Sequence, residues 1–161
     1  MDALQLVMMN SLAKLLPGQE PDDGCLLEAG TWSALRGERT AIQIAVRWDW
    51  RPEARQNRAL ARLRIESPLA GLIMVSRVVT VPVRLPVYPV HDDNILTDQP
   101  GLMPDLLQEM DVQTDERGDY RLLRLPHRQW QSFWLELVVP PDCPGGAWPL
   151  MLRLEDRKSV V

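Results

Sequence analysis

Residues 133–154 contain two runs in which apolar and polar side chains alternate, separated by a block rich in proline and glycine. Alternation with a period of two places every second side chain on the same face of an extended strand. The block at residues 140–146 is typical of a chain reversal. The pattern predicts two antiparallel strands joined as a hairpin, which favours a β-sandwich module over a self-contained enzyme. The side chains expected to share the apolar faces are Phe133, Leu135, Leu137 and Val139, then Trp148, Leu150, Leu152 and Leu154.

Proline is frequent and alternating segments recur along the rest of the chain. The 14 prolines among 161 residues fit short strands with stiff connections better than helices. Pro82 and Pro86 share an outward face, which predicts an edge or crossing strand because proline cannot donate a ladder hydrogen bond. We therefore expect one domain over residues 1–161 with an all-β fold: a two-sheet antiparallel β-sandwich, immunoglobulin-like or jelly-roll-like, of about eight strands. The expected strands cover residues 4–9, 41–48, 63–65, 73–87 and 122–125, and less clearly 26–27.

Residues 91–118 form the longest stretch without clear alternation. This stretch contains several groups of turn-forming residues, including Pro100–Asp105 and Asp115–Gly118. A loop of this length inside a compact domain is usually functional or part of an interface. The sequence therefore predicts an irregular insert that carries a functional surface.

Charge and hydropathy exclude several classes of partner. The net charge is −4, so no basic field attracts nucleic acid or an anionic membrane surface. No run approaches the roughly 18 apolar residues of a membrane span. The apolar start lacks the basic residues of a secretory signal, so a cytoplasmic protein is expected. Cys25 and Cys143 are expected to be small buried side chains with free thiols, with a disulfide as the less favoured alternative.

The acidic and histidine residues do not form a recognisable catalytic or metal-binding motif. Adjacent acidic residues occur in polar, turn-like stretches, where aspartate side chains favour turns, so we expect solvated turns rather than acid–base catalysis. His91 and His127 accompany no nucleophile motif and have no metal-ligand spacing with the cysteines. No catalytic residue, cofactor or metal is therefore expected. The acidic pairs are Asp22-Asp23, Asp92-Asp93 and Asp115-Glu116.

The six tryptophans and one basic cluster are the remaining candidates for binding. Trp48 and Trp148 lie on apolar faces and are expected in the core, whereas Trp32 fits either environment. Three others fall on loops or outward faces, where they form a sugar-stacking platform or are covered by a neighbouring domain. The basic cluster is interpreted as a solvated strand and loop. The outward tryptophans are Trp50, Trp130 and Trp134, and the arginines are Arg51, Arg55, Arg58, Arg62 and Arg64.

Three segments together resemble the N-terminal domain of glycoside hydrolase family 123 and its DUF4091-type relatives. Leu35–Gln43 is similar to the "R-G-E-…-Q" signature that opens the main strand in that family. Pro100–Leu107 resembles its "P-D-P-L" loop, although Leu106 stands in place of the second proline. Residues 134–148 resemble its "W-v-e-v-x-V-P-x-d-a-x-x-G-x-Y" hairpin, with Trp148 in place of the usual tyrosine.

The resemblance implies a β-sandwich that precedes a (β/α)₈ barrel, which hydrolyses β-linked N-acetylhexosaminides with carboxylates of its own. This chain stops after the last expected strand, so the barrel is expected to be absent and the chain alone non-catalytic. The resemblance favours a domain that braces the barrel, its partner in the same polypeptide. The first alternative is an independent carbohydrate-binding module, and a weaker one is a cell-surface adhesion module. The expected interdomain interface consists of Pro100, Gly101, Met103, Pro104, Asp105, Trp130 and Trp134.

Overall fold

The computed structural model describes residues 3–27, 31–49, 58–84, 95 and 97–156, and within them nine strands and two short 3-10 helices. The strands in the first half of the chain are β1 (Ala3–Asn10), β2 (Arg39–Asp49), β3 (Arg58–Glu66) and β4 (Ile73–Val83). Those in the second half are β5 (Gly101–Glu109), β6 (Gln113–Asp115), β7 (Gly118–Pro126), β8 (Gln131–Val138) and β9 (Met151–Asp156). The 3-10 helices are η1 (Asp23–Cys25) and η2 (Ala70–Leu72). None of these helical segments has the length and hydropathy of a membrane span.

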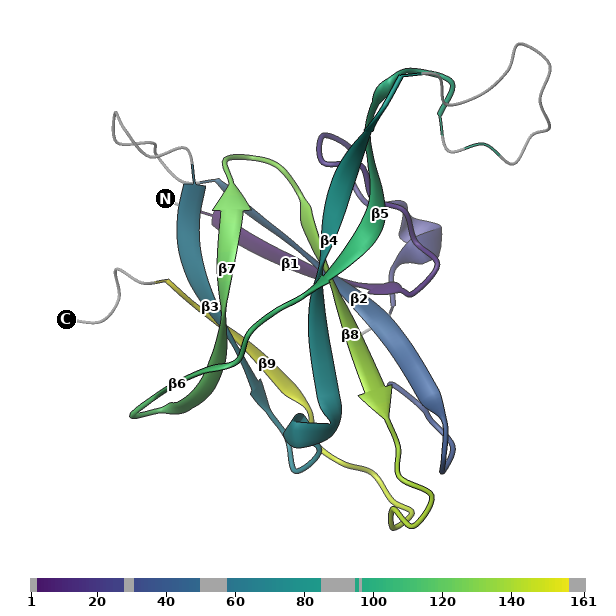
Figure 1. The fold of residues 1–161 in the computed structure, drawn as a ribbon, viewed down its shortest axis with the longest axis vertical. Helices are drawn as coiled ribbons and strands as arrows, with labels where there is room; N and C mark the ends of the chain where they lie inside the picture. The colour runs from purple at the N-terminus through teal and green to yellow at the C-terminus, as the bar shows by residue number, and fades with distance from the viewer. Residues whose placement is uncertain (1–2, 28–30, 50–57, 85–94, 96, 157–161) are drawn as a thin grey trace.

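The strands form two antiparallel sheets that pack face to face (Figure 1). The five-stranded sheet has the order β1-β2-β8-β4-β5, and the four-stranded sheet has the order β6-β7-β3-β9. This arrangement confirms the predicted all-β sandwich, with nine strands instead of about eight.

The main core lies between the two sheets and is made of the alternating apolar side chains of five strands. A strand buried on one face contributes every second side chain to the core, and a fully buried Val, Leu, Ile or Phe contributes about 1.5–3 kcal/mol. Leu150, Leu152 and Leu154, on and just before β9, also pack against this core, as their alternation predicts. The buried core residues are Ile42, Ile44, Val46, Trp48, Ala61, Leu63, Ile65, Ile73, Val75, Leu123, Leu125, Phe133, Leu135 and Leu137.

A second, smaller cluster covers the other face of the five-stranded sheet near β1 and β2. The segment after β1 folds over this face and brings Ala13 and Leu15 against Met9, Ala45 and Trp130. The amide of Gln43 holds this segment in place. Its two N–H groups on Nε2 are shared among three carbonyl oxygens at the end of β1 and in the segment, so a buried polar side chain is satisfied by the loop that covers it. The acceptors are Asn10 at 3.4 Å, Ser11 at 3.0 Å and Ala13 at 2.8 Å.

The predicted C-terminal hairpin is wrong in its pairing. Strand β8 lies in the five-stranded sheet between β2 and β4, whereas β9 pairs with β3 in the other sheet. The link through Gly146 therefore crosses from one sheet to the other instead of closing a hairpin. Gly146 has a φ of 152°, a backbone conformation that glycine adopts at little steric cost. Trp148 precedes β9 and is 41% exposed, so its expected place in the core is also wrong.

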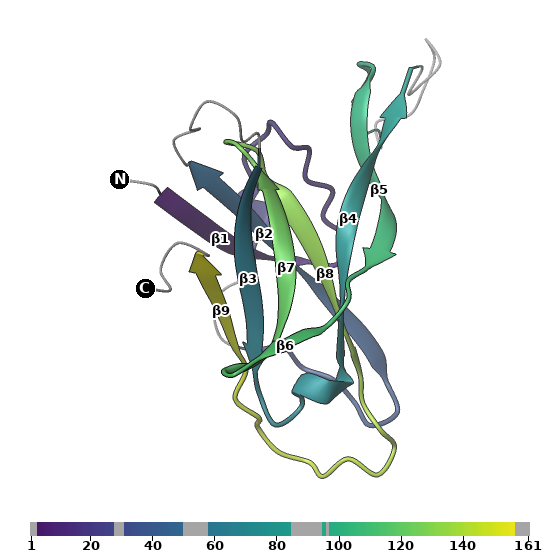
Figure 2. The same ribbon diagram turned by 60° about the vertical axis from the view of Figure 1, so that its left-hand side comes forward.

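The predicted irregular insert at 91–118 contains two strands, β5 and β6. Strand β5 pairs with β4 over Ser76–Val83, whereas β4 pairs with β8 over Ile73–Arg77. Strand β4 thus leaves β8 and continues with β5 alone as its partner, and the two project from the sandwich as an arm (Figure 2). Pro82 lies on this part of β4, which has β5 as its one partner among the described strands and is therefore locally an edge, one of the two settings that its prolines predict.

Candidate functional site

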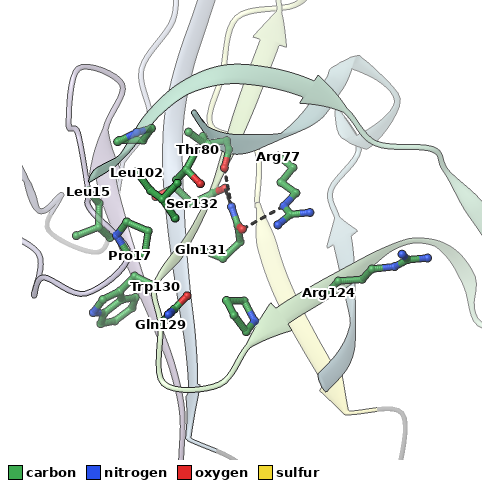
Figure 3. A pocket seen from close by; sticks show the side chains of 13 residues that line it. Leu15, Pro17, Arg77, Thr80, Leu102, Arg124, Gln129, Trp130, Gln131 and Ser132 are labelled. Carbon is green, nitrogen blue, oxygen red and sulfur yellow. Dashed lines mark hydrogen bonds between the residues drawn. The ribbon is translucent and has the colours of Figure 1, made fainter. Parts of the chain in front are cut away.

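A small hollow lies at the base of this arm, between β5, the start of β8 and the segment after β1 (Figure 3). Its volume is ≈ 170 Å³. The hollow has apolar walls and a polar floor, and no Asp or Glu is among the side chains that line it. The lining residues are Leu15, Pro17, Arg77, Val78, Thr80, Leu102, Pro104, Arg124, Pro126, Gln129, Trp130, Gln131 and Ser132.

Gln131 forms part of the floor and joins β8 to β4 where the two strands separate. Its side chain is buried, and Nε2 donates to the carbonyl oxygens of Val78 at 2.7 Å and Ser132 at 3.0 Å. Its Oε1 accepts a hydrogen bond of 3.1 Å from Nε of Arg77. Because the ladder between β4 and β8 ends at Arg77, the Gln131 amide replaces the strand partner that Val78 lacks on this side. Gln131 is therefore a structural residue with no spare hydrogen of its own for a ligand.

Ser132 and Thr80 present hydroxyl groups at the same hollow. Ser132 is 5% exposed, and its hydroxyl makes no hydrogen bond to any residue that the structure describes. The Thr80 hydroxyl is likewise without such a bond within the described ranges. Neither hydroxyl oxygen is fully buried without a partner, so both are open to the hollow, where water or a ligand can donate to them or accept from them.

Trp130 lines the hollow but is covered by the chain itself. It is 6% exposed, and its indole N–H donates to Oε2 of Glu20 at 3.2 Å. Its backbone N–H donates to the carbonyl oxygen of Pro17 at 2.9 Å. Nζ of Lys14 in the same segment donates to the carbonyl oxygen of Pro104 at 3.2 Å, which ties this segment to β5. Trp130 thus anchors the segment after β1 and leaves little indole surface for a partner.

The residues of the predicted interface divide between two places. Pro104 and Trp130, distant in sequence, meet at the hollow, and Pro104 is buried there. Gly101 and Asp105 are exposed on β5, and Met103 is half-buried. Pro100 immediately precedes β5 and is exposed, and Trp134 lies farther along β8. The residues that sequence reasoning missed are Arg77, Thr80, Gln131 and Ser132, which match no motif and meet only through the separation of β4 from β8.

Trp134 belongs to an exposed apolar area on the outer face of the five-stranded sheet. It pairs with Gln43 on β2 and with Ser76 on β4. It is half-buried, and its indole nitrogen has no hydrogen-bond partner among the described residues. We name the area the outer patch; its members are Met74, 44% exposed, Leu107, 46% exposed, Val138, 36% exposed, and Trp134.

The arginine cluster is not the solvated face that its sequence predicts. Arg64 is buried, with Nη2 2.7 Å from Oδ2 of Asp115 and Nε 3.1 Å from Oε2 of Glu155. Arg62 also contacts Asp115, and both guanidinium groups lie over the ring of Tyr120 at 4.7 and 5.3 Å. The hydrogen bond from Arg64 holds the pKa of Asp115 below its usual value. These charges fasten the β6–β7 hairpin to β3, while Arg51 and Arg55 lie outside the described residues.

Both acidic pairs that the structure describes occur in turns, as expected, although Asp115 is half-buried in ion pairs with Arg62 and Arg64 instead of solvated. Asp22 caps η1, its Oδ1 accepting a hydrogen bond of 2.9 Å from the backbone N–H of Gly24. Asp115 accepts one of 2.9 Å from the backbone N–H of Arg117. In the described part of the chain no three His, Cys, Asp or Glu side chains gather as a metal site would require. His91, Asp92, Asp93 and Trp50 lie outside the described residues.

The two cysteines are free, and each is half-buried rather than buried. Cys25 packs against the smaller apolar cluster, while Cys143 lies in the link between β8 and β9. The predicted free thiols are therefore confirmed.

Two of the family-like segments contact each other. In the turn that contains Arg36 and Glu38, the backbone N–H of Gly37 donates to the carbonyl oxygen of Val139 at 3.0 Å. The backbone N–H of Val139 donates in return to the carbonyl oxygen of Glu38 at 2.9 Å. Gly37 has a φ of 74°, so the glycine of this signature takes a conformation that other residues rarely adopt.

Comparison with solved structures extends this likeness from motifs to the fold. The chain matches a family 123 glycoside hydrolase from Clostridium perfringens, analysed for the details of glycolipid glycan hydrolysis, with a TM-score of 0.53 and 11% sequence identity. The chain has a fold like part of that enzyme. The match covers 99% of this chain and 26% of the enzyme, so this chain spans about a quarter of its length. No protein-family model and no curated protein matches the sequence.

Proposed function

We propose that this chain is the non-catalytic N-terminal β-sandwich module of a β-N-acetylhexosaminidase-like glycoside hydrolase, and that it braces the catalytic barrel. The observation that carries the proposal is the exposed apolar surface of β5 and the outer patch, on a chain whose fold resembles a quarter of a family 123 enzyme. Apolar surface gathered in one place on a domain usually marks a contact with a partner.

The side chains of β5 support docking of a folded domain. Leu102, Leu106 and Leu107 are 53%, 56% and 46% exposed, although leucine is among the residues most often buried. Strand β5 is also an edge of its sheet, and an edge strand can add a strand from another copy. Two features oppose such addition here: Pro104 lacks an N–H, and the β4–β5 register shifts beside Asp105. The exposed leucines therefore suit a partner that packs against the faces of the arm.

The acidic residues support a non-catalytic role. Hydrolysis of a glycoside requires one acid at the leaving oxygen and a second group at the anomeric centre. Around the hollow no lining side chain is a carboxylate. Asp22 and Asp115 are used in a cap, a turn and ion pairs.

The proposal is tested by incubating the purified chain with an aryl β-N-acetylgalactosaminide, alone and with the barrel domain added. We expect no turnover by the chain alone, and activity that depends on the barrel and is more resistant to heat when the chain is present. Turnover by the chain alone would overturn the non-catalytic role. An equal half-life of the barrel with and without the chain would overturn the bracing role.

A further inference from the structure

We infer that the hollow at the base of the arm binds a single neutral, hydroxyl-rich ring, such as one sugar residue at the end of a glycan. This inference is independent of the bracing role, because the hollow is formed by the chain itself. Its lining combines the hydroxyl groups of Ser132 and Thr80 with apolar walls (Figure 3).

The volume of the hollow fits one six-membered ring. An apolar protein cavity of about 150 Å³ accepts benzene, and this hollow has a volume of ≈ 170 Å³. A longer oligosaccharide would extend out of the hollow along the arm. The hollow therefore selects for a terminal ring and not for the middle of a chain.

The floor of the hollow suits hydroxyl groups. Ser132 and Thr80 present hydroxyls, and Gln129 adds an exposed amide, so all three groups both donate and accept hydrogen bonds. A purely apolar ligand would displace water from the Ser132 hydroxyl without replacing its hydrogen bonds, at a cost in free energy. A sugar hydroxyl can donate to or accept from the same group. The walls of Leu102 and Pro126 offer apolar surface to the C–H groups of the ring.

Charge makes a neutral ligand the best match. A cation would find no carboxylate among the lining side chains. An anion would require a cationic group directed at it, whereas Nε of Arg77 donates its hydrogen bond to the amide oxygen of Gln131. Arg124 is exposed, and its guanidinium points away from the hollow in Figure 3. The lining thus provides hydrogen bonds without a charge aimed at the ligand.

The inference is tested by titrating the isotope-labelled chain with three sugars that share one ring. Binding is monitored by the NMR signals of the backbone amides of residues 129–132. The sugars are methyl β-galactoside, galacturonate and galactosamine, which are neutral, negative and positive. We expect saturable shifts with the neutral sugar and at least threefold weaker binding of the two charged sugars. Saturation by galacturonate alone would show an anion site, and no saturable shift with any sugar would show that the hollow holds water only. Either result would overturn the inference.

Variants separate this site from the tryptophan surface. Ser132→Ala should weaken binding of the neutral sugar about two- to tenfold, which is the range for one lost hydrogen bond. Ser76→Ala is the matched control, because Ser76 lies on β4 but pairs with Trp134 on the outer face. It should bind as the unmodified chain does. Loss of binding in Trp134→Ala with full binding in Ser132→Ala would place the sugar on the outer patch and overturn the inference.

Discussion

Two arginines, Arg64 and Arg121, are almost fully buried on opposite faces of the four-stranded sheet, and only Arg64 has carboxylate partners among the residues that the structure describes. Arg121 points into the sandwich at 8% exposure, opposite Leu63 on the neighbouring strand. Its Nη2 donates to the carbonyl oxygen of Ile73 at 3.3 Å, and its Nε has no partner among the described residues. Burial lowers the pKa of the Arg121 side chain, because a charge is costly in a poorly solvated place.

The same substitution should therefore have opposite effects at the two positions. Arg121→Met should leave the free energy of unfolding unchanged or raise it by about 1 kcal/mol, because an apolar side chain of similar volume replaces an unpaired charge. Arg64→Met should lower it by about 1–2 kcal/mol, because it leaves Asp115 and Glu155 without their shared partner. Urea unfolding at neutral pH measures both values. If Arg121→Met lowered the free energy of unfolding more than Arg64→Met does, the different roles assigned to the two arginines would be wrong.

Asp115 gives the stability of the protein a dependence on acid pH. Its pKa lies below the usual value of 3.8, first because of the hydrogen bond from Arg64. A carboxyl whose folded pKa is depressed stabilises the fold above its unfolded pKa, and this contribution is lost as the pH falls through the folded pKa. Asp115→Asn should therefore be less stable than the unmodified chain at neutral pH, with a difference that shrinks below about pH 4. Asp111→Asn, at an exposed position, is the control. A difference that stays constant down to the acid limit of the fold would contradict the assignment.

Alternation along a strand indicates which of its faces is buried but not which strand lies beside it. This is why residues 41–48 and 133–139 were predicted correctly as core strands, whereas the pairing of the last two strands was not. Strand β5 was missed for a different reason. The register shift beside Asp105 breaks the period of two, so Pro104 and Leu107 pair with Thr80 and Val78 on one face despite their odd spacing.

The link between β8 and β9 should depend on one of its two glycines. Gly146 has a φ of 152°, which other residues rarely adopt, whereas Gly145 is outside this region. Gly146→Val should then lower the free energy of unfolding by about 1–3 kcal/mol. Gly145→Val is the matched control and should cost less, because its new side chain meets only the mobile end of Arg36, at 3.4 Å. Thermal unfolding of both variants tests this difference. Equal melting temperatures would mean that the link does not need a positive φ at Gly146.

The sequence predicted the fold of the whole molecule, and two residues of its expected interface, Pro104 and Trp130, line the hollow. The segment Pro100–Leu107 was predicted to be an irregular functional loop from its turn residues and its family-like pattern; most of it forms strand β5, and its functional role stays a prediction. The hollow could not be predicted, because Ser132 and Thr80 meet only where β4 leaves β8. Such a site depends on how two strands separate, and no local pattern records that geometry.

Docking on the arm can be tested separately from its sugar site. Leu107→Glu should leave the melting temperature of the isolated chain nearly unchanged, because the side chain is 46% exposed. It should weaken association with the barrel domain, because a charge at the centre of an apolar contact loses its hydration without gaining a partner. Leu35→Glu is the matched control: Leu35 is 76% exposed and lies in the turn that pairs with Val139, away from the arm. Hydrogen exchange of β5, with and without the barrel, gives the readout. We expect slower exchange in the unmodified chain and in Leu35→Glu, and no slowing in Leu107→Glu. Equal protection of β5 in all three proteins would show that the barrel docks elsewhere.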